Sequence, residues 1–296
     1  MTKHVACFSI LVLLACTDGT APGGRPAIAF MAFPFPSSSS PNFDIYVVDS
    51  LGGQLTDVTH NPARDDDPAW SPDGSKIIFS SAGRDTTGRW HLFLMRDDGS
   101  GLTPLTSGAG SEWGPDWSPD GAKIAFISSS RLDVMNADGS GVIPLLTDAF
   151  YEDHPSWSPD GRIAFYSNRG ASGQSAGHVY VINANGSGLT SIGDTTATEE
   201  TPSWSPDGRR IAFSSNRDTR AFQIWTMNPD GTSPIRLTSD SGGNGYPAWS
   251  RDGSKIVFVS YRDSSSEIYV MKADGSDQTR LTHIPATSKV KPHWRP

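Results

Sequence analysis

The chain has 296 residues, with 24 Lys and Arg against 32 Asp and Glu, so its formal net charge is −8. The length is sufficient for one or two domains with a buried core, and a hydrophobic share of 36% together with 30 glycines argues against global disorder. The acidic balance argues against nucleic acid as a partner, because binding to it requires a basic surface.

The N-terminus has the pattern of an export signal. One lysine precedes an apolar run over residues 5–15, which is too short to span a bilayer as a helix. The run ends in Leu13-Leu14-Ala15-Cys16, which resembles the lipobox of bacterial lipoproteins. We therefore expect residues 1–15 to be a cleaved signal peptide and Cys16 to carry a diacylglycerol anchor. The alternative is an ordinary secreted precursor.

Residues 16–25 are small, polar and rich in glycine, so we predict a flexible tether behind the lipidated Cys16. Cys7 is lost with the signal and Cys16 is consumed by lipid, which excludes disulfides and thiol catalysis. Thr17 instead of Asp after the cysteine favours the outer membrane of a Gram-negative cell. We expect an exported, membrane-anchored lipoprotein on the periplasmic face of that membrane or on the cell surface.

From residue 26 onward the sequence repeats. A Pro-x-Trp-Ser-Pro-Asp-Gly unit starts at Pro68 and recurs with one variation, and a sixth fragment ends the chain at Pro296. The spacings between successive tryptophans of this unit are 47, 40, 47, 45 and 45 residues. These tryptophans are Trp70, Trp117, Trp157, Trp204, Trp249 and Trp294. A period near 45 is typical of propeller blades.

Each repeat predicts four short strands. The tryptophan run is followed by an Ile-x-Phe run such as 77–79, a third apolar run such as 92–95, and a fourth strand near a Leu-Thr pair such as 105–106. In the Ser-Pro-Asp-Gly turn, proline fixes φ and glycine accepts the left-handed conformation. We therefore interpret its aspartates as turn formers: Asp73, Asp120, Asp160 and Asp207.

The first repeat lacks a first strand, while the chain ends with a spare one at 291–294. Pairing this C-terminal strand with the N-terminal strands at 27–30, 45–48 and near 58–59 completes a sixth blade and removes exposed edges. The predicted fold is all-β: a closed, six-bladed β-propeller of four-stranded antiparallel blades over residues 26–296. An open solenoid is the alternative. We expect the repeated tryptophans to pack between neighbouring blades.

PxWSPDG, followed by xIxF and later by IYVMxADG, resembles the propeller repeats of the TolB-like family over roughly residues 25–296. In that family the TolB propeller binds the peptidoglycan-associated lipoprotein, so the resemblance implies a scaffold for a protein or peptide. TolB carries an α/β domain ahead of its propeller, and here only the predicted tether precedes the first strand. Contacts of that domain with the energy-transducing Tol proteins are therefore not implied.

The two faces of the predicted propeller differ in sequence. The Ser-Pro-Asp-Gly and Asn/Asp-Gly turns lie on one face, which we call the turn face. The loops between second and third strands and the connections between blades lie on the other, which we call the loop face. Irregular segments at 33–43, 82–89, 170–177 and 217–221 belong to the loop face. Variable loops on a rigid scaffold usually carry binding, so this face is the candidate site.

Acidic residues precede the first strands and arginines follow the second strands. We expect these acids to approach the central channel: Asp66, Asp67, Glu112, Glu152, Asp153, Glu199 and Glu200. The arginines are Arg84, Arg131, Arg169, Arg217 and Arg262. Either the two sets form a mixed-charge rim that binds a partner, or they pair and hold the loops together at about 0–1 kcal/mol each. A third hypothesis is an acidic ring that binds calcium at the channel mouth.

Signs of catalysis are few. Residues 173–177 match the GxSxG pattern of hydrolases, but that pattern needs a strand and a helix around the serine, and here it lies in a Gly/Ser loop. His91 and His178 recur at the starts of third strands, which favours repetition over metal ligation. We name no catalytic residue, no metal site, and no cofactor besides the hypothetical calcium.

We therefore predict a non-catalytic, lipid-anchored propeller of the cell envelope that binds a protein or peptide. One alternative is a carbohydrate-binding or carbohydrate-processing propeller with a divalent cation at the channel mouth. Another is a structural or receptor-associated surface module. We expect a monomer that meets the membrane only through its lipid.

Overall fold

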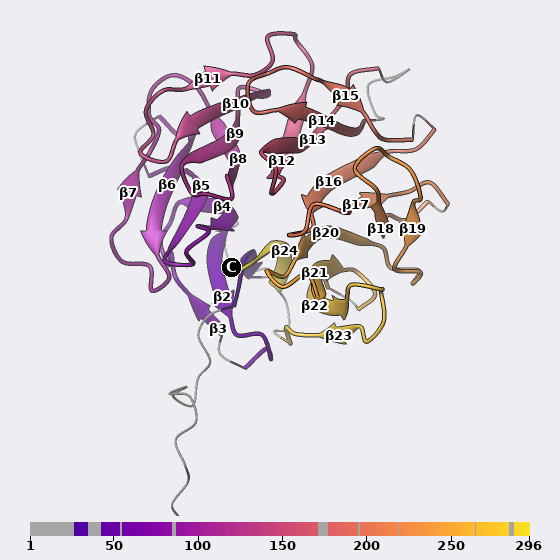
Figure 1. The fold of residues 1–296 in the computed structure, drawn as a ribbon. Coiled ribbons are helices and arrows are strands. Elements are labelled where there is room, and N and C mark those ends of the chain that lie inside the picture. The colour runs from indigo at the N-terminus through magenta and orange to yellow at the C-terminus, as the bar shows by residue number, and fades with distance from the viewer. Residues whose placement is uncertain are drawn as a thin grey trace, which may run out of the picture.

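A computed structural model of the protein describes residues 27–34, 43–53, 55–84, 87–170, 177–194, 196–218, 220–263, 265–283 and 287–296. The predicted signal peptide, Cys16, the tether and Ser175 of the GxSxG match lie outside these ranges. The described strands form six four-stranded antiparallel sheets around a central axis (Figure 1). The predicted six-bladed, all-β propeller is confirmed. No helix in the described ranges is long and apolar enough to cross a membrane.

The blades follow one another along the chain, except that the first takes its inner strand from the C-terminus. The first blade is formed by β24 (Thr287–Trp294), β1 (Ile28–Pro34), β2 (Asp44–Val48) and β3 (Leu55–Asp57). The second blade is β4 (Arg64–Trp70), β5 (Lys76–Ala82), β6 (Trp90–Arg96) and β7 (Thr103–Pro104). The third is β8 (Glu112–Trp117), β9 (Lys123–Ser128), β10 (Arg131–Asn136) and β11 (Ile143–Pro144).

The remaining blades repeat the same order from the inner to the outer strand. The fourth is β12 (Glu152–Trp157), β13 (Arg162–Ser167), β14 (His178–Asn183) and β15 (Thr190–Ser191). The fifth is β16 (Glu199–Trp204), β17 (Ile211–Ser215), β18 (Gln223–Met227) and β19 (Ile235–Arg236). The sixth is β20 (Asn244–Trp249), β21 (Lys255–Ser260), β22 (Glu267–Lys272) and β23 (Thr279–Arg280).

The C-terminal strand closes the ring. β24 pairs antiparallel with β1, with Ile28 opposite Trp294, and it is longer than the predicted segment 291–294. The outer strands lie about two residues before the predicted Leu-Thr pairs. The threonine of the pair binds the third strand through its side chain instead of pairing with it as a strand residue. Thr106 Oγ1 accepts a hydrogen bond of 2.9 Å from the backbone N–H of Leu92 in β6.

Six hydrophobic clusters make up the core, one at each junction between blades, and each contains or contacts one repeated tryptophan. Trp157, for example, packs with Ile127 and Val134 of the third blade and with Ile163 and Phe165 of the fourth. None of the six indole N–H groups has a hydrogen-bond partner among the described residues. The tryptophans therefore contribute apolar contact rather than hydrogen bonds.

The Ser-Pro-Asp-Gly turns are built by a repeated set of hydrogen bonds. Ser71 Oγ donates to Asp73 Oδ1 at 2.6 Å and accepts from the N–H of Lys76 at 3.0 Å, while Gly74 takes a φ of 65°. The Ser71 hydroxyl is the main cause that lowers the pKa of Asp73 to about 2. Asp120, Asp160 and Asp207 accept the same bond from Ser118, Ser158 and Ser205. All four aspartates therefore hold their turns.

Every inner strand contains a β-bulge at the residue before its proline. In β4 the pairing register shifts between Asp66 and Ala69, and the other inner strands shift at the equivalent place. Proline cannot donate to the ladder, so the bulge accommodates it within a paired strand. The residue before the proline has a φ between 48° and 60° in each blade: Asp67, Gly114, His154, Thr201, Tyr246 and Lys291. For the five that are not glycine this left-handed conformation is unfavourable.

Candidate functional site

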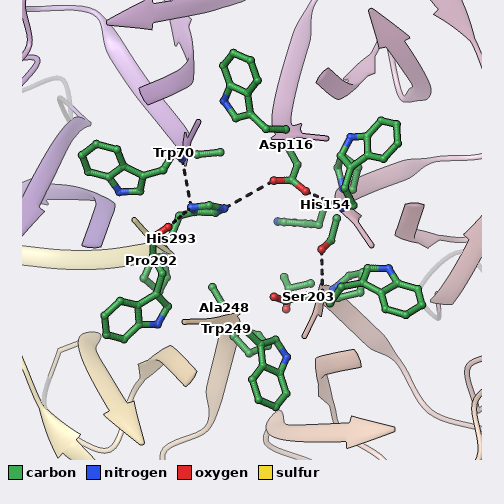
Figure 2. A pocket seen from close by; sticks show the side chains of 18 of the residues that line it. Trp70, Asp116, His154, Ser203, Ala248, Trp249, Pro292 and His293 are labelled. Carbon is green, nitrogen blue, oxygen red and sulfur yellow. Dashed lines mark hydrogen bonds and ion pairs between the residues drawn. The ribbon is translucent and has the colours of Figure 1, made fainter. Parts of the chain in front are cut away.

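A cavity of about 410 Å³ lies on the propeller axis and opens on the turn face; we call it the funnel (Figure 2). Its wall includes the inner-strand prolines and the turn prolines: Pro68, Pro115, Pro155, Pro202, Pro247, Pro292, Pro72, Pro119, Pro159 and Pro206. In Figure 2 the indoles of Trp70 and Trp249 point away from the cavity, toward the blade junctions. Sequence analysis had placed the candidate site on the loop face and did not anticipate this funnel.

The residue after each inner-strand proline lines the middle of the funnel, and three of these residues tie neighbouring blades together. Asp116 Oδ2 accepts the backbone N–H of Trp157 at 2.7 Å. Ser156 Oγ accepts that of Trp204 at 3.1 Å, and His293 Nδ1 accepts that of Trp70 at 3.3 Å. These residues were missed by sequence analysis, although their fixed place in the repeat is a signal that could have found them.

The bulge residues form the inner end of the funnel. Lys291 Nζ lies 2.5 Å from Asp67 Oδ1 and 3.1 Å from Asp66 Oδ2. Burial opposes the charge of Lys291, but Asp66 and Asp67 raise its pKa well above the ordinary value. Burial raises the pKa of Asp66 to about 6 even though Lys291 acts in the opposite direction. The rings of His154 and Tyr246 are in contact here, with centroids 5.7 Å apart and planes tilted by 58°.

Asp153 and Glu200 lie just before the bulges, toward the loop face. Asp153 accepts hydrogen bonds from the Tyr151 hydroxyl at 2.7 Å and from Trp113 Nε1–H at 3.2 Å. Glu200 has no hydrogen-bond or ion-pair partner among the described residues. Burial raises the pKa of Glu200, His154 lowers it and Asp153 raises it. The loop-face end of the channel is therefore acidic, and the Glu200 carboxylate there has no hydrogen bond or ion pair among the described residues.

Three predicted channel residues do not reach the channel, so that part of the prediction is wrong. Glu112, Glu152 and Glu199 are 7%, 1% and 0% exposed and lie within the protein. Successive residues of a strand point to opposite sides, so Asp153 and Glu200 face the axis while their preceding neighbours are turned away from it. The predicted acids that remain at the channel are Asp66, Asp67, Asp153 and Glu200.

Four of the five predicted arginines are pinned by carboxylates and aromatic rings. Arg84 binds Asp65 at 2.6 Å and lies over the ring of Phe79. Equivalent pairs join Arg169 to Glu152 and to Asp148, Arg217 to Glu199, and Arg262 to Asp240. Arg169, Arg217 and Arg262 also lie over the rings of Tyr180, Trp225 and Tyr269. This arrangement matches the interpretation in which arginine–acid pairs hold the loops.

Arg131 departs from the predicted pattern, because it opens the third strand instead of following the second. The loop between β9 and β10 consists of Ser129 and Ser130, whose φ angles are 51° and 72°. Arg131 then binds Asp133 of its own strand at 2.7 Å, and this hydrogen bond raises the pKa of Arg131.

A residue at the start of the third strand links its blade to the next. His91 Nδ1 lies 2.8 Å from Glu112 Oε2. At the equivalent position of the sixth blade Glu267 binds Lys289 at 3.0 Å. His178 occupies the same position in the fourth blade. Within the described part of the chain, no group of three or more His, Cys, Asp or Glu side chains is arranged to hold a metal ion.

A second cavity of about 270 Å³ lies between the fifth and sixth blades, and we call it the loop-face cavity. Its wall includes Glu200, Phe222, Tyr246 and Tyr261, with Arg220 also lining it. Tyr246 and Thr201 line the funnel as well, so the two cavities share part of their walls. Sequence analysis missed Phe222 and Tyr261, because aromatic residues on loops carry no repeat signal.

The fold is shared with several solved structures. TolB from Acinetobacter baumannii matches at 20% identity and a TM-score of 0.78, over 92% of this chain and 67% of that one. A putative TolB from Agrobacterium tumefaciens matches at 21% and 0.67, over 92% and 100%. An oligogalacturonate lyase from Vibrio parahaemolyticus matches at 15% and 0.56, over 88% and 75%.

No curated protein matches the sequence. The model of the TolB β-propeller domain family matches residues 19–192 and 173–296, which together span most of the chain. The five repeats with their Pro-x-Trp unit and the closure by the C-terminal strand agree with that match. The chain therefore belongs to the TolB β-propeller domain family.

Proposed function

We propose that the protein is a non-catalytic lipoprotein of the cell envelope whose propeller binds a protein or peptide at the loop-face end of the channel. The observation that carries the proposal is the charge at that end. The carboxylates of Asp66 and Asp67 bind the ammonium group of Lys291, which also lowers the pKa of Asp153. Glu200 lies close enough to Asp153 for that acid to raise its pKa.

Two physical arguments support binding at this place. Partly buried carboxylates whose pKa values are raised by burial are costly to keep, and such groups cluster at functional sites. Strained backbone is also concentrated at functional sites, and the bulge residues Asp67, His154, Thr201, Tyr246 and Lys291 ring the channel with positive φ.

The N-terminal sequence supports the location. The apolar run before Cys16 and the Leu-Leu-Ala-Cys sequence resemble those of exported lipoproteins, which supports a location on the periplasmic face of an outer membrane or on the cell surface. The family resemblance favours a protein partner. The protein is a monomer in this proposal and meets the membrane through lipid alone.

The test is affinity capture from detergent-solubilised envelopes with the full chain as bait. A variant carrying Asp66→Asn and Asp153→Asn removes two charges from the channel end without changing side-chain size. The matched control carries Asp138→Asn and Asp230→Asn, which removes two exposed charges from the turn face and keeps the oxygen that each turn requires. Glu112 is left intact because it is buried against His91.

We expect a protein that is retained by the wild type and the control and lost by the channel variant. Equal retention by all three proteins would place the binding site elsewhere. Retention of an envelope carbohydrate instead of a protein would support the carbohydrate-binding alternative.

A further inference from the structure

The loop-face cavity combines features that select one kind of ligand. It is a hollow of about 270 Å³ between the fifth and sixth blades, large enough for one long side chain of a peptide. Three of its wall residues are aromatic: Phe222, Tyr246 and Tyr261. Tyr261 is 44% exposed, so the cavity can be reached from solvent.

Glu200 is the carboxylate on this wall, and it is half-buried. No described residue forms a hydrogen bond or an ion pair with it, and His154 is the nearby group that lowers its pKa. The neighbouring acids Asp66 and Asp67 are paired with Lys291, and Asp153 is held by Tyr151, Trp113 and His154. A half-buried carboxylate without a partner gains free energy when a cation reaches it.

The aromatic walls favour the same ligand charge. The faces of tyrosine and phenylalanine rings attract cations, most strongly where water is partly excluded. Arg220 also lines the cavity, but its side chain is exposed and no ion pair joins it to Glu200 within the described part of the chain, so water solvates its charge. An anionic ligand would be repelled by Glu200 and by Asp153 behind it.

We propose that the loop-face cavity binds a lysine or arginine side chain of the peptide partner, with Glu200 as counter-ion and Tyr246, Tyr261 and Phe222 as walls. This inference rests on the proposed function and names the chemistry that the partner presents. The ammonium or guanidinium group meets Glu200, and the methylene stem packs on the rings.

The test compares acetyl-Gly-Gly-X-Gly-Gly-amide peptides with lysine, arginine, norleucine or glutamate at X, titrated into the full chain in detergent and followed by ligand-observed NMR. We expect the lysine and arginine peptides to bind about tenfold more tightly than the norleucine peptide, and the glutamate peptide to bind more weakly. Equal binding of the lysine and norleucine peptides overturns the inference, as does failure of every peptide to bind.

Glu200→Gln is the deciding variant. It should remove most of the tenfold preference for the lysine peptide, because the rings alone attract a cation more weakly, and it should leave norleucine-peptide binding unchanged. Asp138→Asn on the turn face should change neither. A preference that is undiminished in Glu200→Gln overturns the assignment.

The envelope capture separates this inference from the function on which it rests. If capture depends on Asp66 and Asp153 but the peptides show no preference for a cation, the binding function stands and the cavity assignment fails. If the wild type and the channel variant capture the same proteins, the proposed binding function fails, whatever the peptides show.

Discussion

The repeated tryptophan buries a polar N–H group in the core without giving it a hydrogen bond. Trp157 is 8% exposed and packs with apolar residues of two blades, yet its indole N–H has no hydrogen-bond partner among the described residues. A buried N–H usually finds an acceptor. Bulk and flatness therefore explain the tryptophan at this position, and the N–H contributes no hydrogen bond.

Substitution of Trp157 tests this explanation. Trp157→Ala should lower the free energy of unfolding by about 3–5 kcal/mol, because it leaves a cavity at the blade junction. Trp157→Phe should cost clearly less than Trp157→Ala, because it keeps an aromatic ring, leaves a smaller cavity and removes the unpaired donor. Urea unfolding followed by circular dichroism and fluorescence gives both values. A loss in Trp157→Phe as large as in Trp157→Ala would show that the N–H has a partner.

A second residue, Asp44, predicts a pH dependence. Burial is the main cause that raises the pKa of Asp44 from 3.8 to about 6, and Asp57 raises it further. The folded state therefore binds a proton more tightly than the unfolded chain, so stability is greatest below pH 4 for this group and is lost as pH rises toward 6. The difference corresponds to roughly 3 kcal/mol.

Unfolding measured from pH 4 to pH 7 in the wild type and in Asp44→Asn isolates this effect. The wild type should lose roughly 2–3 kcal/mol relative to the variant across that interval. Parallel pH profiles for the two proteins would contradict the assignment. Asp73, whose pKa is lowered to about 2, should contribute only about 0.3 kcal/mol in this interval, and it does so equally in both proteins.

At the scale of the element, β24 carries the closure of the ring. Its Lys289 is fully buried and binds Glu267 of β22 in the neighbouring blade at 3.0 Å, while Arg280 binds the same carboxylate at 2.7 Å. Burial lowers the pKa of Lys289, and Glu267 opposes that change. The closing strand is therefore held by a buried charge as well as by its pairing with β1.

Removal of one charge of this pair should destabilise the protein more than removal of both charges would suggest. Lys289→Met should destabilise the protein by about 3–5 kcal/mol, because Glu267 stays buried with less compensation. The double variant Lys289→Met, Glu267→Gln should lose less than the sum of the two single variants, since neither charge remains. Lys123→Met, at an exposed position of β9, is the control. Additive losses in the double-mutant cycle would show that the two residues are not coupled.

Elements were predictable where the signal is local. The tryptophan spacing, the Ser-Pro-Asp-Gly turns and the spare C-terminal strand were enough for the blade number and the closure. The orientation of the inner-strand acids was not, because the alternation of side chains and the bulge before each proline decide which of Glu152 and Asp153 reaches the axis. Pairs such as His91 with Glu112 bring together residues of different blades, and no local pattern marks them.

At the scale of the whole molecule, the channel has two unlike ends. The turn-face end is a proline-walled funnel, and the loop-face end holds carboxylates around Lys291. The repeat explains the first, since every blade supplies the same prolines. The second arises from residues that differ between blades at equivalent positions, such as Asp67, His154, Tyr246 and Lys291. The geometry that the six blades share therefore comes from the repeat, and the candidate site comes from residues that differ between the blades.

Both ends of the described propeller chain emerge on the turn face. The backbone N–H of Arg295 donates to the carbonyl of Ala27 at 2.6 Å, and Trp294 beside it lines the funnel. If Cys16 is lipidated as proposed, the tether leads from the bilayer to this face. Ten residues reach at most about 35 Å. The turn face with its funnel would then lie nearer to the lipid headgroups than the acidic channel end.

This orientation can be measured in liposomes that carry the lipidated protein and a headgroup-linked quencher. A fluorophore at Asp138→Cys on the turn face should be quenched more strongly than one at Asp218→Cys on the loop face; equal quenching would contradict the orientation. A partner would then have to approach from the aqueous side, as a soluble protein or as one fixed to a layer opposite the membrane. The position of Ala27 on the turn face would therefore turn the binding surface toward partners on the side away from the membrane.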